Sequence, residues 1–95
     1  MTQVACRVVE SFDDQRLGVN AIVFHQRDKN DGPHLGELLL HHSGEVMEIE
    51  TADGRSHGVT VFRVKACFGR GLILLPTAMK LRDREEFVLR RFDSP

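Results

Sequence analysis

The feature that most constrains the fold is a pair of strand-like segments on either side of Asp53-Gly54. Residues 46–51 alternate apolar and acidic side chains, and residues 59–66 follow with Phe62 and Val64 on one face. Alternation with a period of two is typical of a half-buried β-strand. Asp-Gly between two such segments favours a two-residue type I′ turn, in which both central residues have positive φ. The pattern therefore predicts an antiparallel hairpin.

Three further segments extend the β-pattern along the chain. Residues 4–12 alternate, residues 19–24 are rich in β-branched and aromatic side chains, and residues 72–75 form a nearly continuous apolar run. The continuous run predicts a strand that is buried on both faces, and residues 13–16 predict a turn. We expect a mainly β fold: a small barrel of about five to seven strands, largely antiparallel, with one or two short helices, or alternatively an α+β fold.

Two segments fit either a helix or a strand. Residues 33–44 carry three leucines at helical spacing, with a proline and a glycine placed to suit the two ends of a helix. In residues 83–92, an aspartate is followed three residues later by a glutamate, and two arginines lie near the end, as in a capped helix. Residues 87–92 also fit a last strand. We favour a helix in both segments.

Length and charge limit the class of protein. The 95 residues, 1–95, have the size of one domain. Thirteen basic and fourteen acidic residues give a net charge of −1, so the basic excess of a typical nucleic-acid-binding protein is absent. The first seven residues lack the pattern of a secretory signal, and no stretch approaches the roughly 20 apolar residues of a membrane span. These features predict a soluble protein without membrane or nucleic-acid partners.

The two cysteines bear on the cellular compartment. Cys6 and Cys67 lie far apart in strand-like segments and form no CxxC pair. We interpret them as two buried thiols, which is compatible with a reducing cytoplasm.

Residues 26–33 are the most polar segment and predict an exposed loop, the first candidate for a lid or a partner-binding loop.

The sequence contains no recognisable catalytic or metal-binding motif. Its histidines have no spacing that joins them to a cysteine pair or to an HExxH motif, so we assign no metal ligand and no catalytic residue. A weaker alternative is a small enzyme that uses the histidines or Cys67, because Lys65 and Arg70 would lower the pKa of the thiol if they converged on it. The histidines are His25, His34, His41, His42 and His57.

Gly69-Arg70-Gly71 is the short motif most suggestive of ligand binding. Glycines on both sides of an arginine allow backbone amides to turn toward an anion, while the side chain supplies positive charge. We therefore take Gly69, Arg70 and Gly71 as candidate cofactor-binding residues. The alternative is a tight turn that carries an exposed arginine.

Residues 34–76 resemble the small double-psi β-barrel domains that bind molybdopterin guanine dinucleotide, a family that includes a small component of formylmethanofuran dehydrogenase. The matching features are Leu35-Gly36 in a helix-like segment, Gly44-Glu45-Val46 leading into a strand, Asp53-Gly54, and the ending Gly71-Leu72-Ile73-Leu74-Leu75-Pro76. The resemblance implies a double-psi barrel and a dinucleotide ligand. The chain departs from the family at residues 38–42, where a short connection is expected, and it shows no evident molybdenum ligand.

These observations favour a non-enzymatic binding or accessory module that engages a partner protein or a second copy of itself. The alternative is a domain that binds a dinucleotide cofactor or another anionic small molecule at Gly69-Arg70-Gly71.

Overall fold

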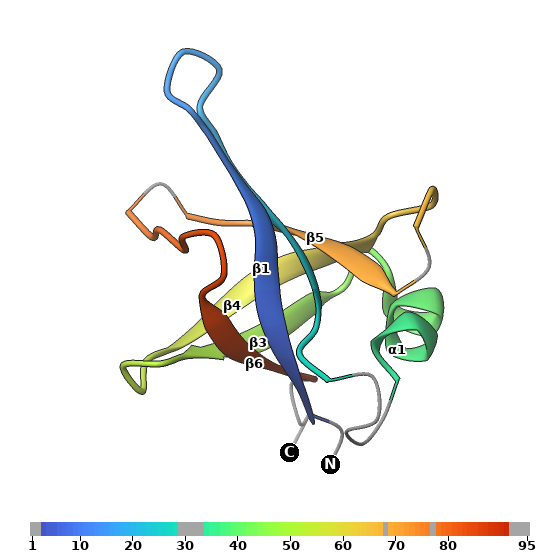
Figure 1. Ribbon diagram of the computed structural model, residues 1–95. Coiled ribbons are helices and arrows are strands. Elements are labelled where there is room, and N and C mark those ends of the chain that lie inside the picture. The colour runs from blue at the N-terminus through green and yellow to red at the C-terminus, as the bar shows by residue number, and fades with distance from the viewer. Residues whose placement is uncertain (1–2, 29–33, 68, 77, 92–95) are drawn as a thin grey trace.

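The described residues form a closed six-stranded barrel with one helix (Figure 1). The computed structural model describes residues 3–28, 34–67, 69–76 and 78–91. Neighbouring strands follow the order β1-β2-β5-β4-β3-β6 around the barrel, and every pair is antiparallel. This confirms the mainly β, largely antiparallel prediction. The elements are β1 (Gln3–Asp14), β2 (Val19–Gln26), α1 (Leu35–His42), β3 (Val46–Thr51), β4 (Ser56–Arg63), β5 (Arg70–Leu74) and β6 (Glu86–Arg91).

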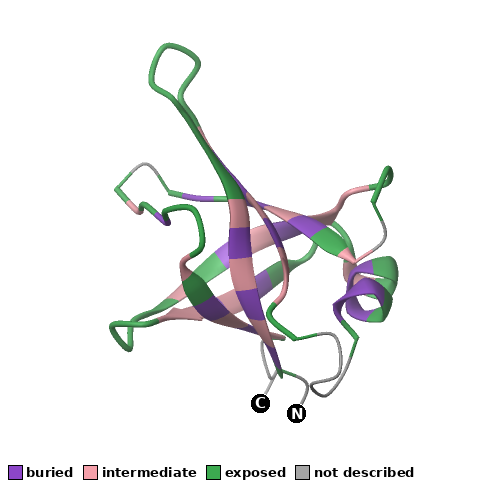
Figure 2. Cartoon of the chain, in the orientation of Figure 1, coloured by how far each residue is buried: buried purple, intermediate pink, exposed green. Residues whose placement is uncertain are grey.

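The core fills the barrel with alternate side chains from each strand. In Figure 2 buried and more exposed residues alternate along β1, where Val4, Cys6 and Val8 point inward. Closure removes the edges of the sheet, so each strand has one inner and one outer face. The buried cluster comprises Val4, Cys6, Val8, Ile22, Phe24, Leu35, Leu38, Leu39, Met47, Ile49, Val59, Val61, Ile73, Leu75, Leu81, Phe87 and Leu89.

The β3–β4 hairpin forms as predicted, but its turn is of a different type. Gly54 has φ 85°, whereas Asp53 does not have positive φ. The Gly54 amide donates to the Thr51 carbonyl at 2.9 Å, and the Thr51 amide donates to the Arg55 carbonyl at 2.9 Å. This is a type I turn followed by a left-handed glycine, which makes a three-residue loop with a bulge. The predicted two-residue type I′ turn is wrong, because only one residue of the loop adopts positive φ.

The segment that we expected to be a C-terminal helix is strand β6. Phe87 and Leu89 are buried, while the residues between them face outward. β6 pairs with β1 on one side and β3 on the other, so it supplies the contact that closes the barrel. The Asp83 carboxylate caps no helix and instead accepts hydrogen bonds from the amide and hydroxyl of Ser11, both at 3.0 Å. Long-range pairing therefore overrides the local helix signal.

A helix forms within the segment at residues 33–44, as predicted, and it spans Leu35–His42. Leu35, Leu38 and Leu39 are buried, and Gly44 follows the helix with φ 88°. α1 packs against β4 and β5 at one end of the barrel. Residues 29–33 of the predicted exposed loop lie outside the described residues. Among the residues that are described, no helix has the length and apolarity needed to cross a membrane.

Strand β5 is buried on one face only, which corrects the expectation of burial on both. Ile73 and Leu75 point into the barrel, whereas the Leu74 side chain lies on the outer surface and is 46% exposed. A closed barrel has a single interior, and α1 covers the end of the barrel rather than the outside of β5. The outer face of this strand is therefore left open to solvent.

β1 and β2 extend beyond the barrel as a two-stranded arm that ends in a loop at residues 15–18 (Figure 1). The register of the pair shifts between Val8 and Glu10. A β-bulge of this kind reverses which side chains face the core, so Phe12 lies on the outer face although Val8 points inward. The arm thus carries the outer face of the sheet away from the body of the protein.

Candidate functional site

The predicted Gly69-Arg70-Gly71 motif lies where the chain enters β5. Gly69 has φ 87°, a conformation that glycine adopts without strain. Gly71 is buried, and a Cβ placed on it would lie 2.6 Å from Cζ of Phe24 and 3.0 Å from Cδ1 of Leu39. The first glycine therefore makes the turn, and the second allows the α1 leucine and the core aromatic ring to approach the strand closely.

The backbone amides of the motif are largely used within the fold. The Arg70 amide donates to the Cys67 carbonyl at 3.2 Å, and the Arg70 carbonyl accepts from the Val64 amide at 3.1 Å. Gly71 lies in the ladder between Phe24 of β2 and Arg63 of β4. The Arg70 side chain, in contrast, is exposed and forms no ion pair with any described residue. The guanidinium is therefore the charged group that the motif exposes to solvent.

Arg70 borders a cavity of about 670 Å³ between the start of α1 and the start of β5. The pairing of β2 with β5 places His25 opposite Arg70, and the first turn of α1 forms the facing wall. Carboxylates line each of four other cavities on the described surface, but none of the described residues around this one is acidic. We call it the α1–β5 pocket; it is lined by His25, Gln26, His34, Leu35, Gly36, Cys67, Gly69 and Arg70.

The N-terminus of α1 borders this pocket. The first turn of any helix leaves amides without intrahelical acceptors, and aligned peptide dipoles make this end electropositive. Here the Leu35 amide donates to Oε1 of Gln26 at 3.2 Å, and the N-cap residue His34 makes no side-chain capping bond. Glu37 belongs to the first turn but is not among the residues that line the pocket.

The histidines do not assemble into a metal centre within the described residues, where no group of three ligating side chains converges. His25 Nδ1 lies 2.8 Å from the Gln26 carbonyl, and His42 Nδ1 lies 2.5 Å from Oε2 of Glu45. His57 lies at the opposite end of the barrel. His25 and His34 do line the same cavity. Strand pairing brings them together, so their spacing in the sequence could not have predicted it.

The two cysteines differ in environment, which corrects the expectation of two buried thiols. Cys6 is fully buried in the barrel, and burial raises the pKa of its thiol far above the usual range. Cys67 is exposed in the turn that precedes β5. This turn lies outside the barrel wall, because β4 ends at Arg63 rather than at residue 66.

We expect a thiol reagent such as 5,5′-dithiobis(2-nitrobenzoate) to modify one cysteine in the native protein. Cys67 should react rapidly, whereas Cys6 should react only when the barrel opens, because a buried thiol is neither accessible nor ionised. Counting the released thiolate before and after adding denaturant measures this difference. A Cys67→Ser variant that still reacts rapidly without denaturant would contradict the placement of Cys6.

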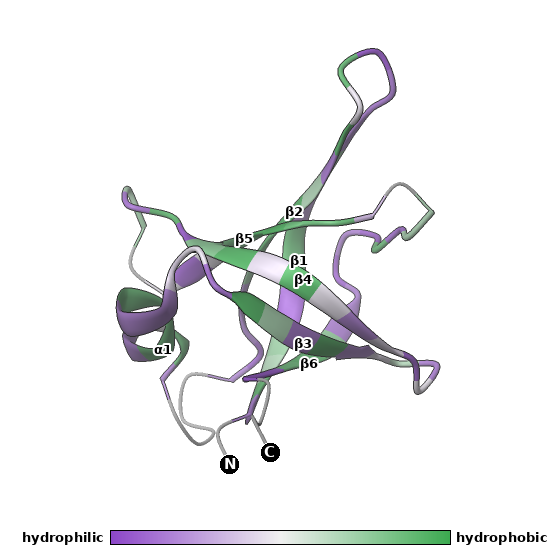
Figure 3. Ribbon diagram, turned by 180° about the vertical axis from the view of Figure 1, so that it is seen from behind, coloured by the Kyte–Doolittle hydropathy of each residue, from purple (hydrophilic) through white to green (hydrophobic). Residues whose placement is uncertain are grey.

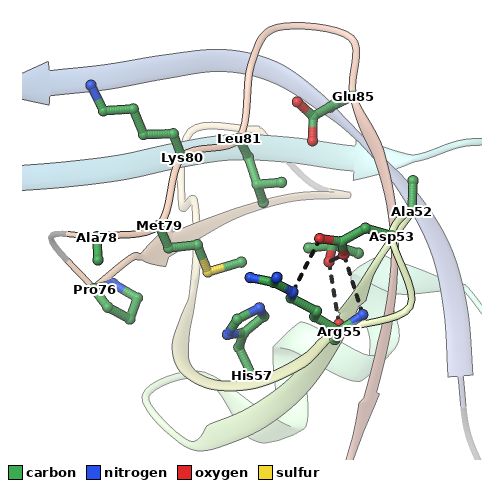
Figure 4. Close-up of a pocket in the computed structure, with 11 residues that line it drawn as sticks. Ala52, Asp53, Arg55, His57, Pro76, Ala78, Met79, Lys80, Leu81 and Glu85 are labelled. Carbon is green, nitrogen blue, oxygen red and sulfur yellow. Dashed lines mark hydrogen bonds and ion pairs between the residues drawn. The ribbon is translucent and has the colours of Figure 1, made fainter.

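A second cavity, of about 530 Å³, lies between the β3–β4 hairpin and the connection from β5 to β6 (Figure 4). The Asp53 carboxylate accepts hydrogen bonds from the Thr51 hydroxyl and the Arg55 amide, which hold its pKa below the usual value. Nε of Arg55 lies 3.6 Å from the same carboxylate, and the Lys80 side chain extends away from this pair. Opposite charges thus neutralise one another here, so this cavity has less capacity to attract an anion than the α1–β5 pocket.

Comparison with known proteins provides no family assignment. No family model matches the chain, and searches of curated proteins and of solved structures find no similar protein. Nothing therefore links the barrel to a particular double-psi family. The function has to be inferred from the chain's own residues.

Proposed function

We propose that this protein is a non-enzymatic binding module that holds a small phosphate-bearing anion in the α1–β5 pocket. The observation that carries the proposal is a cavity whose described lining contains no carboxylate. The N-terminus of α1 and the Arg70 guanidinium, which forms no ion pair with any described residue, converge on this cavity. A guanidinium group binds phosphate oxygens through charge-assisted hydrogen bonds, and a helix N-terminus supplies amide donors and positive potential.

The dimensions and lining of the pocket suit such a ligand. Cavities that bind cofactors and other small molecules usually measure about 300–1,000 Å³, and this one measures about 670 Å³. Leu35 and Gly36 supply apolar wall, while His25 and His34 add ring nitrogens that can bond to a ligand. The ligand class implied by the resemblance, a guanine dinucleotide, carries the pyrophosphate that this chemistry recognises. Two free cysteines fit a reducing compartment such as the cytoplasm.

Association with a protein is the second candidate function. Large apolar side chains remain exposed on the arm and on β5, with Phe12 41% exposed and Leu74 46% exposed. Phe12 lies on β1 and Leu74 on β5, with β2 between them, and exposed large apolar side chains of this kind are available for contact with a partner. The two functions use different parts of the barrel, so a ligand-binding module that also associates is consistent with both.

Replacing Arg70 by alanine should weaken pyrophosphate binding about ten- to a hundredfold, because one charge-assisted contact is worth roughly 1.5–3 kcal/mol. Isothermal titration calorimetry with inorganic pyrophosphate measures the affinity, and added salt should weaken binding to the parent more than to the variant. The thermal midpoint should hardly change, because the side chain is exposed.

Arg82→Ala is the matched control, since Arg82 is also exposed but lines a different cavity. Its affinity for pyrophosphate should equal that of the parent. Equal losses in both variants would show a non-specific charge effect, and absence of binding to the parent at millimolar pyrophosphate would refute the proposed function.

A further inference from the structure

Two cavities on the described surface of the barrel meet at one side chain, that of His25. The first is the α1–β5 pocket, and the second is a cavity of about 520 Å³ that is bordered by β1, β2 and the start of β6. His25 lines both, so the two cavities are neighbouring parts of one surface. We call the second cavity the β1 pocket; it is lined by Arg7, Val8, Val9, His25, Arg84 and Glu86.

Strand pairing explains why the two cavities adjoin. In the closed barrel β2 lies between β1 and β5, and the register sets Arg7 opposite His25 and His25 opposite Arg70. The preceding residue, Phe24, points into the core, so the His25 side chain projects outward. Figure 3 shows the start of β5 beside α1, at the end of the barrel away from the arm. Three side chains that can carry positive charge thus follow one another across three neighbouring strands.

The β1 pocket has a guanidinium group that no described residue neutralises. Arg84 is exposed and forms no ion pair within the described part of the chain. Its amide donates to the Val8 carbonyl at 2.9 Å, and the Val8 amide donates to the Glu85 carbonyl at 2.8 Å, so its backbone is tied to β1. Arg84 has φ 70°, a conformation that is uncommon outside glycine and that occurs preferentially at ligand sites.

The one carboxylate among the described residues of the β1 pocket is already bound by arginines. Oε2 of Glu86 lies 2.9 Å from Nη2 of Arg7, and Oε1 lies 3.4 Å from Nη1 of Arg27. These two hydrogen bonds, that from Arg7 first, hold the pKa of Glu86 below its usual value, so the carboxylate stays ionised and paired. Because two arginines and one glutamate line this cavity, its described lining carries an excess of positive charge.

The His25 ring has a free nitrogen at the junction of the two cavities. Its Nδ1 lies 2.8 Å from the Gln26 carbonyl, which only accepts hydrogen bonds, so Nδ1 carries a proton. Nε2 has no hydrogen-bond partner within the described part of the chain. This nitrogen accepts a hydrogen bond when the ring is neutral and donates one when the ring is charged. His25 is therefore placed to contact a ligand that occupies both cavities.

The separation of the arginines sets the length of a ligand that reaches both cavities. Arg7 and Arg70 lie two strands apart, and neighbouring strands are about 4.8 Å apart, so the two backbones are about 10 Å apart. The barrel also curves between them, so their outward side chains diverge. Pyrophosphate, in which both phosphorus atoms share one oxygen, is too short for this distance. Two phosphate groups that are joined by a spacer can reach both cavities.

We propose that the α1–β5 pocket and the β1 pocket form one groove for an extended bisphosphate, a ligand whose two phosphate groups are separated by a spacer, with His25 at the junction. This rests on the proposed function, because the first phosphate occupies the α1–β5 pocket beside Arg70, and it adds a second phosphate subsite at Arg84. Guanidinium groups suit both phosphates. Binding of the first phosphate raises the effective concentration of the second, so the linked ligand gains affinity.

Isothermal titration calorimetry of the full chain with hexane-1,6-diyl bisphosphate tests the groove. The parent should bind this ligand at least about tenfold more tightly than hexyl phosphate, which has the same spacer but one phosphate. Arg84→Asn should remove most of that gain and leave the affinity for pyrophosphate unchanged, and asparagine tolerates the positive φ of this position. Arg70→Ala should weaken the binding of both pyrophosphate and the bisphosphate.

Arg82→Asn is the matched control, because it removes an exposed arginine that lines neither cavity. Its affinity for the bisphosphate should equal that of the parent, and circular dichroism verifies that the variants fold. The second subsite is refuted, and the single-site function stands, if pyrophosphate binding depends on Arg70 but the bisphosphate binds no more tightly than hexyl phosphate. Equal effects of Arg84→Asn and Arg82→Asn would also refute it. If the parent binds neither ligand at millimolar concentration, the proposed function itself fails.

Discussion

Replacing Phe24 by alanine should lower the free energy of unfolding by about 3–5 kcal/mol, the range for removing a large buried aromatic side chain. Phe24 is fully buried and packs edge-to-face on Phe87, with ring centroids 5.2 Å apart. Its ring also lies against Gly71, so it joins β2, β5 and β6 inside the barrel. Urea denaturation followed by circular dichroism measures the loss.

Phe12→Ala is the control for this prediction, because the chemical change is identical and the side chain lies on the outer surface of the arm. We expect a loss below about 1 kcal/mol, as for most surface substitutions. A loss as large as that of Phe24→Ala would mean that the bulge in β1 has been placed wrongly and that Phe12 belongs to the core.

Gly71→Ala should destabilise the protein by about 1–3 kcal/mol, the usual cost of inserting a methyl group into a close-packed core. A Cβ at this position would lie 2.6 Å from Cζ and 2.7 Å from Cε1 of Phe24, closer than real contacts allow, and 3.0 Å from Cδ1 of Leu39. Either the ring or α1 must shift to admit it. The measurement is again the midpoint and slope of urea denaturation.

A double-mutant cycle identifies the cause of this loss. In a Phe24→Leu background, the shorter side chain leaves space for the new methyl group, so Gly71→Ala should cost less than it does in the parent. Equal costs in the two backgrounds would show that contact with Phe24 is not the source. A Gly71→Ala variant as stable as the parent would contradict the close packing itself.

The elements predicted correctly are those whose signal is local. Residues 46–51 alternate because β3 has one buried and one outer face, and the leucines of α1 follow helical spacing because a single side of the helix packs on the barrel. Glu48 and Glu50 are the acidic residues of this alternation. In the structure both accept hydrogen bonds from Arg90 of β6: Nε donates to Oε1 of Glu48 at 2.6 Å, and Nη2 donates to Oε1 of Glu50 at 2.9 Å. The bond to Glu50, followed by the bond to Glu48, raises the pKa of the arginine.

The errors arise where distant segments decide the local structure. β6 carries a plausible helix-capping pattern, yet β1 and β3 both require a partner to close the barrel. Leu74 faces outward because nothing covers the outer side of β5, and the apolar run at residues 72–75 does not indicate whether a strand is covered on one side or on both. The loop at Asp53-Gly54 has three residues rather than the two that we predicted, and composition alone does not distinguish these two loop lengths.

The same distinction applies to the candidate site. Gly69, Arg70 and Gly71 were singled out because their pattern is contiguous in the sequence. His25 and the start of α1 reach the same pocket through the pairing of β2 with β5 and through the packing of Leu39 on Gly71. These contacts are long-range, so no spacing rule could have predicted them. Gly71 was assigned to ligand binding, although in the structure its contacts are with the core.

Nuclear magnetic resonance titration of the ¹⁵N-labelled protein with inorganic pyrophosphate tests the central claim most directly, because each backbone amide reports separately. We predict saturable shifts concentrated at Gly36, Glu37, Gly69 and Arg70, which surround the α1–β5 pocket or form the first turn of α1, with no change at the tip of the arm. Absence of shifts at millimolar pyrophosphate, or shifts confined to the cavity at Asp53 and Arg55, would contradict the account.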